Sequence, residues 1–344
     1  MKGYKALDKD MRAVHGNGMQ FELGKKYTVK GDVVPCQNGF HFCKNIEYLN
    51  FFYDICDSRM FEIEAYGDIR NNNVKYAAEG IQLVRELTKE EINDYFKQNY
   101  QSMICSKESC IRTAVAKQGY GLDILINDGS AYVRAAVARQ GYGLDILVHD
   151  EDEDVRQAVA EQGYGLDILI HDCRWMVRQA VARQGYGLDI LINDEDCNVR
   201  QAVAKQGYGL DILVHDCRWM VRQAVAEQGY GLSILVHDEA EDVRQTVAEQ
   251  GYGLDILIDD EDNYVRKAVA KQGYGLNKLI TDTSKSVRKA VARQGYGLDI
   301  LVHDEDEDVR QAVAEQGYGL DILVNDNDPD VREAAEIMMD RKRG

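Results

Sequence analysis

Proline is scarce in this sequence, and long apolar runs are missing from it. Only two of the 344 residues are proline, which excludes collagen-like and proline-rich linker sequence. No apolar stretch approaches the ~18 residues that a membrane-spanning helix requires, so we expect no membrane partner. Charged residues from Lys2 to Asp10 crowd the first ten positions and leave no apolar segment there, so we also expect no secretory signal.

Cysteine is present but without a disulfide pattern. The spacing of the eight cysteines forms no framework of the kind found in small secreted domains. We therefore expect a reducing, cytoplasmic compartment and no bound metal. Hydrophobic residues make up 45% and charged residues 29% of the chain, which is the balance of a folded protein and not of a disordered one.

Negative charge is concentrated in one part of the chain. Residues 1–110 have a net charge of −1 and residues 331–344 a net charge of +1, so the whole excess of −18 falls within residues 111–330. Binding to a polyanion needs Lys and Arg to displace its counterions. For this segment we therefore expect no direct nucleic-acid partner, and instead a protein partner with a basic surface.

The acidic segment is a tandem array of 22-residue repeats. Ten complete units fill residues 111–330, and an eleventh begins at Val331. Such near-identity predicts an array of stacked units, because one unit cannot bury an apolar face alone. The period is marked by arginines at Arg112, Arg134, Arg156, Arg178, Arg200, Arg222, Arg244, Arg266, Arg288, Arg310 and Arg332.

Each unit predicts two short helices. In one unit, Val155, Ala158 and Val159 form an apolar stripe at helical spacing. Gly163 stops this helix, at a point where a left-handed residue is favoured. After the glycine turn, residues 166–170 supply a short apolar second helix, and an acidic loop leads into the next unit.

The pattern of an aspartate, a variable loop, Val-Arg-x-Ala-Val-Ala and then Leu-x-x-Leu resembles the leucine-rich repeat variant family and, more loosely, HEAT-like repeats. The resemblance covers residues 111–344. It implies a mainly α fold, a right-handed α-solenoid of ten to eleven 22-residue repeats. In this chain Gln-Gly-Tyr-Gly replaces the usual turn between the helices.

Three polar or aromatic side chains recur at fixed positions. From Arg134 to Arg332 each arginine follows an aspartate by six residues, as Arg134 follows Asp128, which favours either a ladder of ion pairs between units or an anion-binding stripe. The tyrosines of the glycine turns, from Tyr120 to Tyr318, favour packing between turns, because the acidic field opposes stacking on nucleic-acid bases. The histidine position holds Asn, Asp or Thr in other units, which favours a polar helix end over a metal ligand.

The four residues before each repeated valine vary, and two of these windows are identical. Both read Cys-Arg-Trp-Met and contain the only two tryptophans of the chain. Trp, Arg and Met are enriched at interface hot spots, although recent duplication of a tolerated loop is the alternative. The predicted partner-binding residues are Arg174, Trp175, Met176, Arg218, Trp219 and Met220.

Two other windows read Glu-Asp-Glu-Asp and predict an acidic edge. A long array dense in carboxylates also favours mimicry of nucleic acid, in which the repeats occupy the basic groove of another protein. The residues of the acidic edge are Glu151, Asp152, Glu153, Asp154, Glu305, Asp306, Glu307 and Asp308.

The first part of the chain predicts a small α+β domain at residues 1–86. Thr88 and Glu91 form a capping box that opens a helix to about Ile104. This helix belongs to a connecting segment at residues 87–110, ahead of the repeats at 111–330 and a capping helix with a basic tail at 331–344. Within the domain we expect an aromatic helix at residues 46–55 and strands at residues 2–7, 21–30, 39–43 and 59–69.

Residues 2–88 are similar to a domain of unknown function found in phage and bacterial proteins. The similarity rests on Lys-Gly-Tyr-Lys-Ala-Leu-Asp from residue 2, Asn-Gly-Phe-His-Phe-Cys from residue 38, and Ser-Arg-x-x-Glu-Ile-Glu-Ala from residue 58. It implies a phage or prophage origin and the cytoplasm of a bacterial host cell, but no established activity.

The segment that contains Phe40, His41 and Phe42, with the aromatic helix after it, also resembles ADP-ribosyltransferases. That resemblance implies an enzyme that uses NAD, with His41, Glu62 and Glu64 as candidate catalytic residues. Against it, no histidine or arginine opens the site near Tyr4. A zinc site or reactive thiol at Cys36, His41 and Cys43 is favoured less, because these residues fall short of four ligands.

The sequence therefore predicts a non-enzymatic protein-binding scaffold without a cofactor. Its acidic repeats bind a host or defence protein, and inhibition by nucleic-acid mimicry is the narrower form of the prediction. The alternative is an ADP-ribosyltransferase-like N-terminal enzyme that the repeats deliver to a target.

Overall fold

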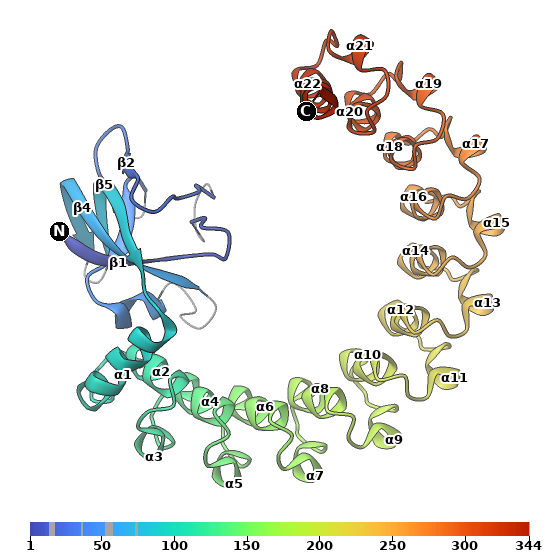
Figure 1. The fold of residues 1–344 in the computed structure, drawn as a ribbon. Helices are drawn as coiled ribbons and strands as arrows, with labels where there is room; N and C mark the ends of the chain where they lie inside the picture. The colour runs from blue at the N-terminus through green and yellow to red at the C-terminus, as the bar shows by residue number, and fades with distance from the viewer. Residues whose placement is uncertain (14–17, 36, 52–57, 73–74, 344) are drawn as a thin grey trace. The chain divides into compact units, whose positions relative to one another are not determined.

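A computed structural model describes residues 1–13, 18–35, 37–51, 58–72 and 75–343. The described part is mainly helical, with 22 α-helices in regular repeats and a small β domain at the N-terminus (Figure 1). It divides into two compact units, Met1–Val177 and Arg178–Gly344. The finer division of the chain at residues 86, 110 and 330 stays a prediction.

The N-terminal domain is built on one antiparallel sheet. Its five strands follow the order β2-β5-β3-β1-β4, and β4 also pairs with β5, so that β5, β3, β1 and β4 close into a ring. The strands are β1 (Lys2–Leu7), β2 (Lys26–Thr28), β3 (Phe40–Cys43), β4 (Arg59–Asn72) and β5 (Lys75–Glu86).

The sheet confirms some expected elements and corrects others. β1, β3 and β4 lie where strands were expected, whereas the strand expected at residues 21–30 shortens to β2, because Gly24 turns the chain at a φ of +78°. The expected helix at residues 46–55 is a 3₁₀ helix, η1 (Ile46–Phe51), as far as the described residues extend. Strand β5 was not expected at all. Its middle holds alanines and Gly80, which stays small because the Tyr66 ring of β4 covers it.

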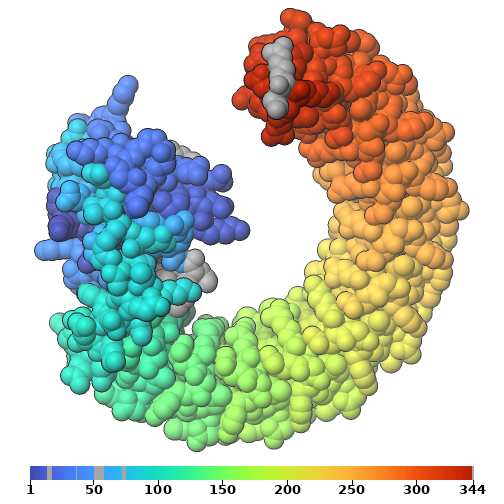
Figure 2. All heavy atoms as spheres, viewed as in Figure 1, coloured from blue at the N-terminus to red at the C-terminus, as the bar shows by residue number. Residues whose placement is uncertain are grey.

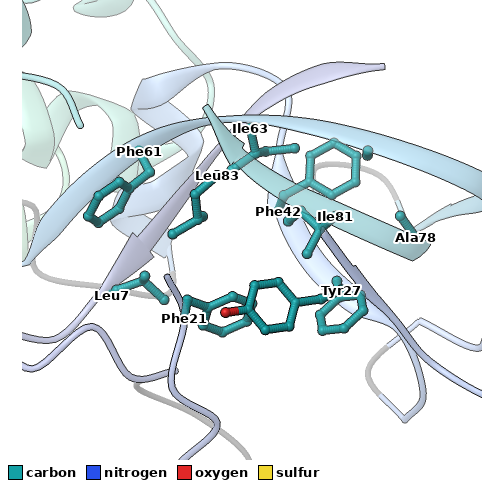
Figure 3. Packing of buried hydrophobic residues seen from close by; sticks show 11 residues of the cluster. Leu7, Phe21, Tyr27, Phe42, Phe61, Ile63, Ala78, Ile81 and Leu83 are labelled. Atoms are coloured by element: carbon teal, nitrogen blue, oxygen red, sulfur yellow. The ribbon is translucent and has the colours of Figure 1, made fainter. Parts of the chain in front are cut away.

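Aromatic side chains fill the core of this domain (Figure 3). Phe21 lies edge-on to Tyr27 and to Phe40, with ring centroids 5.0 and 6.1 Å apart. Each of these contacts is made once in the molecule, so the fit of individual side chains sets the stability of the core. The strands contribute Leu7, Phe42, Phe61, Ile63, Ile81 and Leu83.

Helix α1 (Lys89–Met103) joins the sheet to the repeats, and its start confirms the predicted capping box. The Thr88 hydroxyl accepts a hydrogen bond from the Glu91 backbone N–H at 3.1 Å, and the Glu91 carboxylate accepts one from the Thr88 backbone N–H at 2.8 Å. The helix ends at Met103, one residue before the expected end.

From α2 onward a nine-residue helix alternates with a four-residue helix. The nine-residue helices are α2 (Ser109–Lys117), α4 (Ala131–Arg139), α6 (Glu153–Glu161), α8 (Trp175–Arg183), α10 (Cys197–Lys205), α12 (Trp219–Glu227), α14 (Glu241–Glu249), α16 (Asn263–Lys271), α18 (Lys285–Arg293) and α20 (Glu307–Glu315). The four-residue helices are α3 (Leu122–Leu125), α5 (Leu144–Leu147), α7 (Leu166–Leu169), α9 (Leu188–Leu191), α11 (Leu210–Leu213), α13 (Leu232–Leu235), α15 (Leu254–Leu257), α17 (Leu276–Leu279), α19 (Leu298–Leu301) and α21 (Leu320–Leu323). The longer α22 (Pro329–Arg343) follows them.

The repeats confirm the predicted apolar stripe. In α10, Val199 and Val203 have no exposed surface, and Leu213 of α11 is 2% exposed. Small alanines beside them, such as Ala204, let successive nine-residue helices approach closely. Within the second unit, successive repeats close against one another (Figure 2), so each repeat covers the apolar face of its neighbour.

The glycine turn of each repeat needs both glycines, for different reasons. Gly207 and Gly209 have φ angles of +74° and +59°, in the left-handed region that favours glycine. A Cβ atom at Gly207 would meet open space, whereas one at Gly209 would overlap Cδ1 of Ile192 in the preceding repeat. The backbone conformation alone requires Gly207, and packing between repeats also requires Gly209.

Candidate functional site

The repeated arginine is held inside each repeat. In one repeat, Arg200 donates to the Asp216 carboxylate from Nε at 2.6 Å and from Nη2 at 3.0 Å, while its Nη1 donates to the backbone carbonyl of Asp194 at 2.7 Å. The Asp216 carboxylate also accepts the Arg218 backbone N–H at 2.8 Å. The same ion pair recurs as Arg112–Asp128, Arg134–Asp150, Arg156–Asp172, Arg178–Asp194, Arg222–Asp238, Arg244–Asp260, Arg266–Asp282, Arg288–Asp304 and Arg310–Asp326.

This geometry corrects the expected pairing. From Arg112 to Arg310 the carboxylate partner of the arginine lies sixteen residues later. An aspartate six residues earlier, where there is one, contributes only its backbone carbonyl, as Asp194 does to Arg200. The arginine therefore links the two helices of its own repeat and, through that carbonyl, the loop of the preceding one. Since three guanidinium nitrogens of Arg200 are engaged in this way, the structure favours the structural ladder over an anion-binding stripe.

The ion pair between Arg200 and Asp216 shifts the pKa of both groups. Burial alone raises the pKa of Asp216, but the hydrogen bonds from Arg200 and from the Arg218 backbone outweigh it, so the pKa lies below its ordinary value. The pKa of Arg200 is raised, chiefly by its hydrogen bond to Asp216. Both groups are therefore charged across the neutral range.

The glutamates that follow the ladder aspartates point into solvent. The side chain of Glu195 is 89% exposed and that of Glu239 is 86% exposed, although each lies about 3.5 Å or less from an arginine of the ladder. By contrast, the arginine beside Glu195, Arg178, keeps only 10% of its side chain exposed. The repeats that carry such a glutamate thus bury their recurring cation and display a carboxylate.

The two predicted tryptophans lie at equivalent positions, the first residues of α8 and α12. Trp175 is 37% exposed and Trp219 is 38% exposed. They therefore lie at the starts of helices, whereas the variable windows had suggested loops. Arg174 is exposed, with its Nε 3.8 Å from the Glu153 carboxylate, and Arg218 precedes α12 as its N-cap residue. Both methionines, Met176 and Met220, are half-buried.

The acidic edge is less uniform than its sequence. Asp152 is the N-cap of α6 and accepts the Asp154 backbone N–H, and Asp306 caps α20 in the same way through Asp308. The Asp308 carboxylate also accepts Lys289 Nζ at 2.9 Å and Lys285 Nζ at 3.2 Å, which lowers its pKa. Glu151 and Glu305, which follow ladder aspartates, are the freely displayed members, at 92% and 88% exposure.

Two exposed tyrosines were missed by the sequence analysis. Tyr132 of α4 is 73% exposed and Tyr264 of α16 is 57% exposed. They occupy the window position that holds methionine next to the tryptophans. The signal in the sequence is the aromatic residue at the last position of each of these two variable windows.

The tyrosines of the glycine turns are packed only in part. Tyr120, in the first repeat, stacks on Tyr100 of α1 with ring centroids 5.5 Å apart. The expectation of packing therefore holds for Tyr120, whereas the later turn tyrosines, from Tyr142 to Tyr318, keep 41–43% of their surface exposed.

A cavity of about 450 Å³ in the N-terminal domain brings two of the candidate catalytic residues together. Glu62 and Glu64 line it, with Lys2, Tyr4 and Lys44. The register of the sheet pairs Tyr4 with Glu62 on one side and with Cys43 on the other, so these side chains share one face. His41 lies on the same face, two residues before Cys43 in β3.

One of the two carboxylates of the cavity is held in an ion-pair network. Arg85 holds the Glu62 carboxylate through two hydrogen bonds, from Nε at 3.0 Å and from Nη2 at 2.7 Å, and its Nη1 binds the Glu91 carboxylate at 2.6 Å. Glu62 therefore joins β4 to the start of α1. A carboxylate that is bound in this way is poorly placed to orient a sugar hydroxyl.

The pKa values of His41 and Cys43, on this face, are both shifted so that the neutral form is favoured. Burial, followed by the charge of Lys75, lowers the pKa of His41 to about 4. Burial raises the pKa of the Cys43 thiol to about 12, so Cys43 is no nucleophile at neutral pH. In the described part of the chain, no three His, Cys, Asp or Glu side chains lie close enough to share a metal ion, and Cys36 lies outside that part.

The N-terminal domain matches a family model described as Domain of unknown function (DUF7666), over residues 1–94. The match confirms the expected domain of unknown function, with an end a few residues beyond residue 88. No curated protein matches the chain. None of the described helices combines the length and the apolar character that crossing a bilayer requires.

Among solved structures, the chain is similar to the X-ray structure of Escherichia coli YibA at 16% identity and a TM-score of 0.23, over 76% of this chain and 99% of that one. It is also similar to a computationally designed armadillo repeat protein for modular peptide recognition, at 15% identity and a TM-score of 0.11, over 74% and 94% of the two chains. A designed armadillo repeat protein in complex with the peptide (KR)4 gives 14% identity and a TM-score of 0.11, over 73% and 93%. The repeat architecture of this chain is established by its own helices.

Proposed function

We propose that the repeats form an acidic binding scaffold for a protein partner with a basic surface. The carrying observation is the unequal exposure of opposite charges in the repeats that have a glutamate after the ladder aspartate. Arg178 is 10% exposed in its ion pair, whereas the neighbouring Glu195 is 89% exposed. The excess of −18 in the repeats is therefore displayed as carboxylates on the surface, where it attracts a partner of opposite charge.

Trp175 in the first compact unit and Trp219 in the second supply apolar anchors. Trp175 and Trp219 already lie partly against the protein, so a partner has to cover only the remaining 37–38% of each side chain. An exposed arginine precedes each of them. Truncation of such an anchor costs on the order of 2–4 kcal/mol of binding free energy when the side chain fills a partner pocket.

The narrower form of the proposal is nucleic-acid mimicry. Exposed glutamates that recur at one position of the repeat, such as Glu195, Glu239 and Glu305, take the place of a row of phosphates. The partner is then a nucleic-acid-binding host or defence protein in the cytoplasm of a bacterial cell. We also propose that the repeats belong to the leucine-rich repeat variant family, that they wind in a right-handed sense and that they number ten to eleven.

A capture experiment with the full chain as bait tests the proposal. Capture of a partner from bacterial lysate should weaken as salt rises. The double variant Trp175→Ala, Trp219→Ala should abolish capture and leave the melting temperature nearly unchanged, because neither residue belongs to the buried stripe. Unfolding of the double variant, or undiminished capture, would show that these residues are not anchors.

The matched control changes charge and leaves the anchors in place. Glu151→Lys with Asp154→Lys reverses charge at the acidic edge but spares Asp152, which caps α6. We expect this variant to slow association and reduce the salt dependence, with a smaller change in dissociation rate. Tight binding of duplex DNA by the wild-type chain at physiological salt would contradict the charge argument.

A further inference from the structure

In the second compact unit, Arg178–Gly344, the four-residue helices display a second apolar surface, which is distinct from the tryptophans. In four consecutive repeats the turn tyrosine and the isoleucine four residues later remain exposed, by 42–43% for the tyrosines and 46–57% for the isoleucines. These helices form a row of their own beside the nine-residue helices (Figure 1). The Tyr/Ile strip consists of Tyr186, Ile190, Tyr208, Ile212, Tyr230, Ile234, Tyr252 and Ile256.

The fold of the repeats makes little use of this strip. In α11 and the residue after it, Leu213 and Val214 are 2–3% exposed and bury the apolar face of the helix, whereas Ile212 is 57% exposed. The backbone N–H of each strip tyrosine donates to the nine-residue helix before it, as Tyr208 does to Val203, but within the described residues no ring contact or hydrogen bond is made by a strip tyrosine side chain. Four tyrosines alone then expose on the order of 300 Å², which is comparable to the largest apolar patch of an ordinary monomer.

In the first repeat another element, α1, covers the turn tyrosine, and its contacts with Tyr120 show what kind of group can bind at this position. Tyr120 stacks on Tyr100 of α1 with an angle of 23° between the ring planes. Its hydroxyl donates to Asn93 Oδ1 at 2.8 Å. An occupant that offers a planar group and a hydrogen-bond acceptor therefore fits this position.

Charge decides which occupant fits. Exposed aspartates lie between the tyrosine and the isoleucine in three of the four repeats, at Asp189, Asp211 and Asp255. A second copy of the chain would bring like charges together, and nucleic acid or an anionic membrane would do the same. The arginine guanidinium is planar, stacks on tyrosine and pairs with carboxylates through two hydrogen bonds, which lysine cannot do.

We propose that the Tyr/Ile strip binds an extended, arginine-rich segment of a protein partner, with aliphatic side chains between the arginines. This inference rests on the proposed function. It specifies the kind of partner segment that binds the strip, which is a different surface from the one that contains the tryptophans. The strip ends after α15, because Lys278 takes the isoleucine position in the next repeat and pairs with Asp259. Its positive charge repels an arginine there.

Fluorescence anisotropy with the full chain and a labelled peptide of alternating arginine and leucine tests the strip. We expect binding that weakens with salt, weaker binding of the lysine–leucine peptide and none of a glutamate–leucine peptide. The triple variant Ile190→Ser, Ile212→Ser, Ile234→Ser leaves every charge in place and should weaken binding about tenfold or more, since it removes only apolar contacts. Equal affinity of the triple variant and the wild type would overturn the proposal.

A gain of binding gives an independent test. Lys278→Ile should join the strip to Tyr296 and Ile300, so that a peptide long enough to reach them binds more tightly while a short peptide binds as before. This variant keeps the proposal testable even if the serine substitutions lower the melting temperature. If the long peptide binds Lys278→Ile no more tightly than it binds the wild type, the proposed binding role of the strip is wrong. The Trp175→Ala, Trp219→Ala variant should bind the peptide like wild type, so partner capture that depends on the tryptophans alone would overturn the strip and leave the proposed function standing.

Discussion

The N-terminal domain and the repeats bury their apolar side chains in opposite ways. The domain interlocks large aromatic rings, such as Phe21 against Tyr27 and Phe40, in contacts that occur once. The repeats bury small aliphatic residues, such as Val203 and Ala204, in contacts that recur from one repeat to the next. The stability of the domain should therefore be all-or-none, whereas that of the repeats is a sum of similar interfaces between neighbours.

The two regions also treat buried cations differently. In the domain, Lys5 is 5% exposed and its Nζ donates to the backbone carbonyl of His41 at 3.0 Å. Burial lowers the pKa of Lys5 to about 8. In the repeats every buried arginine meets a carboxylate, and its pKa is raised, as for Arg222. Burial of Lys5 thus disfavours its charged form in the domain, whereas the buried arginines of the repeats form ion pairs that hold the repeats together.

The largest effect is expected from a charge placed in the repeated core. Val203→Asp should cost about 3–5 kcal/mol of unfolding free energy, because an unpaired carboxylate replaces a fully buried side chain. Urea unfolding of the full chain measures it. Ile212→Asp is the control, since Ile212 is 57% exposed, and should change little. Similar losses in both variants would contradict the assignment of buried and exposed faces.

Removal of one ladder carboxylate should come next. Asp216→Asn should cost about 2–3 kcal/mol at neutral pH, because Arg200 keeps a buried charge without its partner. The folded pKa of Asp216 is lowered, so its stabilising effect is present above the unfolded value of about 4 and is lost as pH falls through the folded value. Urea unfolding at neutral and acidic pH should show the difference between variant and wild type disappearing below about pH 4. A difference that persists in acid would contradict the ion-pair account.

The two glycines of one turn give a matched pair with a smaller effect. Gly207→Ala should cost about 1 kcal/mol, because alanine is strained in the left-handed region. Gly209→Ala carries the same strain and also meets Ile192, so it should cost about 2 kcal/mol. Thermal unfolding of both variants separates conformation from packing, and equal costs would show that Ile192 moves aside freely.

Acid should separate the two regions. The folded pKa of His41 is about 4, below its ordinary 6.5, so the unfolded domain takes up the proton first. The stability of the domain should therefore rise with pH between about 4 and 6.5, by less than about 1.4 kcal/mol per pH unit. The repeats should respond only below about pH 4. Amide exchange across this range measures both regions, and His41→Gln should flatten the response of the domain alone.

Substitution of the two cavity carboxylates should have no effect on NAD consumption. Glu62→Gln should break the ion pair with Arg85 but leave NAD consumption at the background rate of the wild type, and Glu64→Gln, as the control in the same cavity, should do the same. Turnover by the wild-type chain that falls in the Glu62 variant would support the ADP-ribosyltransferase alternative.

Periodicity predicted the helices of the repeats well but could not choose between registers that differ by one period. An aspartate six residues before one arginine is also sixteen residues after the previous arginine. Proximity along the chain favoured Asp128 as the partner of Arg134, whereas the folded geometry selects Asp150. Only the way the two helices of a repeat lie against each other decides between them.

The N-terminal domain was harder to predict because its strands depend on distant residues. Strand β5 contains Ala77, Ala78 and Gly80, which have low strand propensity. They are buried in the sheet because β3 and β4 flank them and the Tyr66 ring covers Gly80. For the same reason, the engagement of Glu62 by Arg85, 23 residues later, left no signal in the local sequence.

The carbonyl that each arginine takes from the preceding loop has a genetic consequence. Because Arg200 reaches back to Asp194 and forward to Asp216, a deletion or duplication of one whole repeat restores the same bonds at the new junction. A chain that gains or loses one whole repeat should therefore still fold, because each repeat contacts only its neighbours. Lineages that carry this gene can therefore lengthen or shorten the array, and change how many binding positions it offers, without inventing a single new contact.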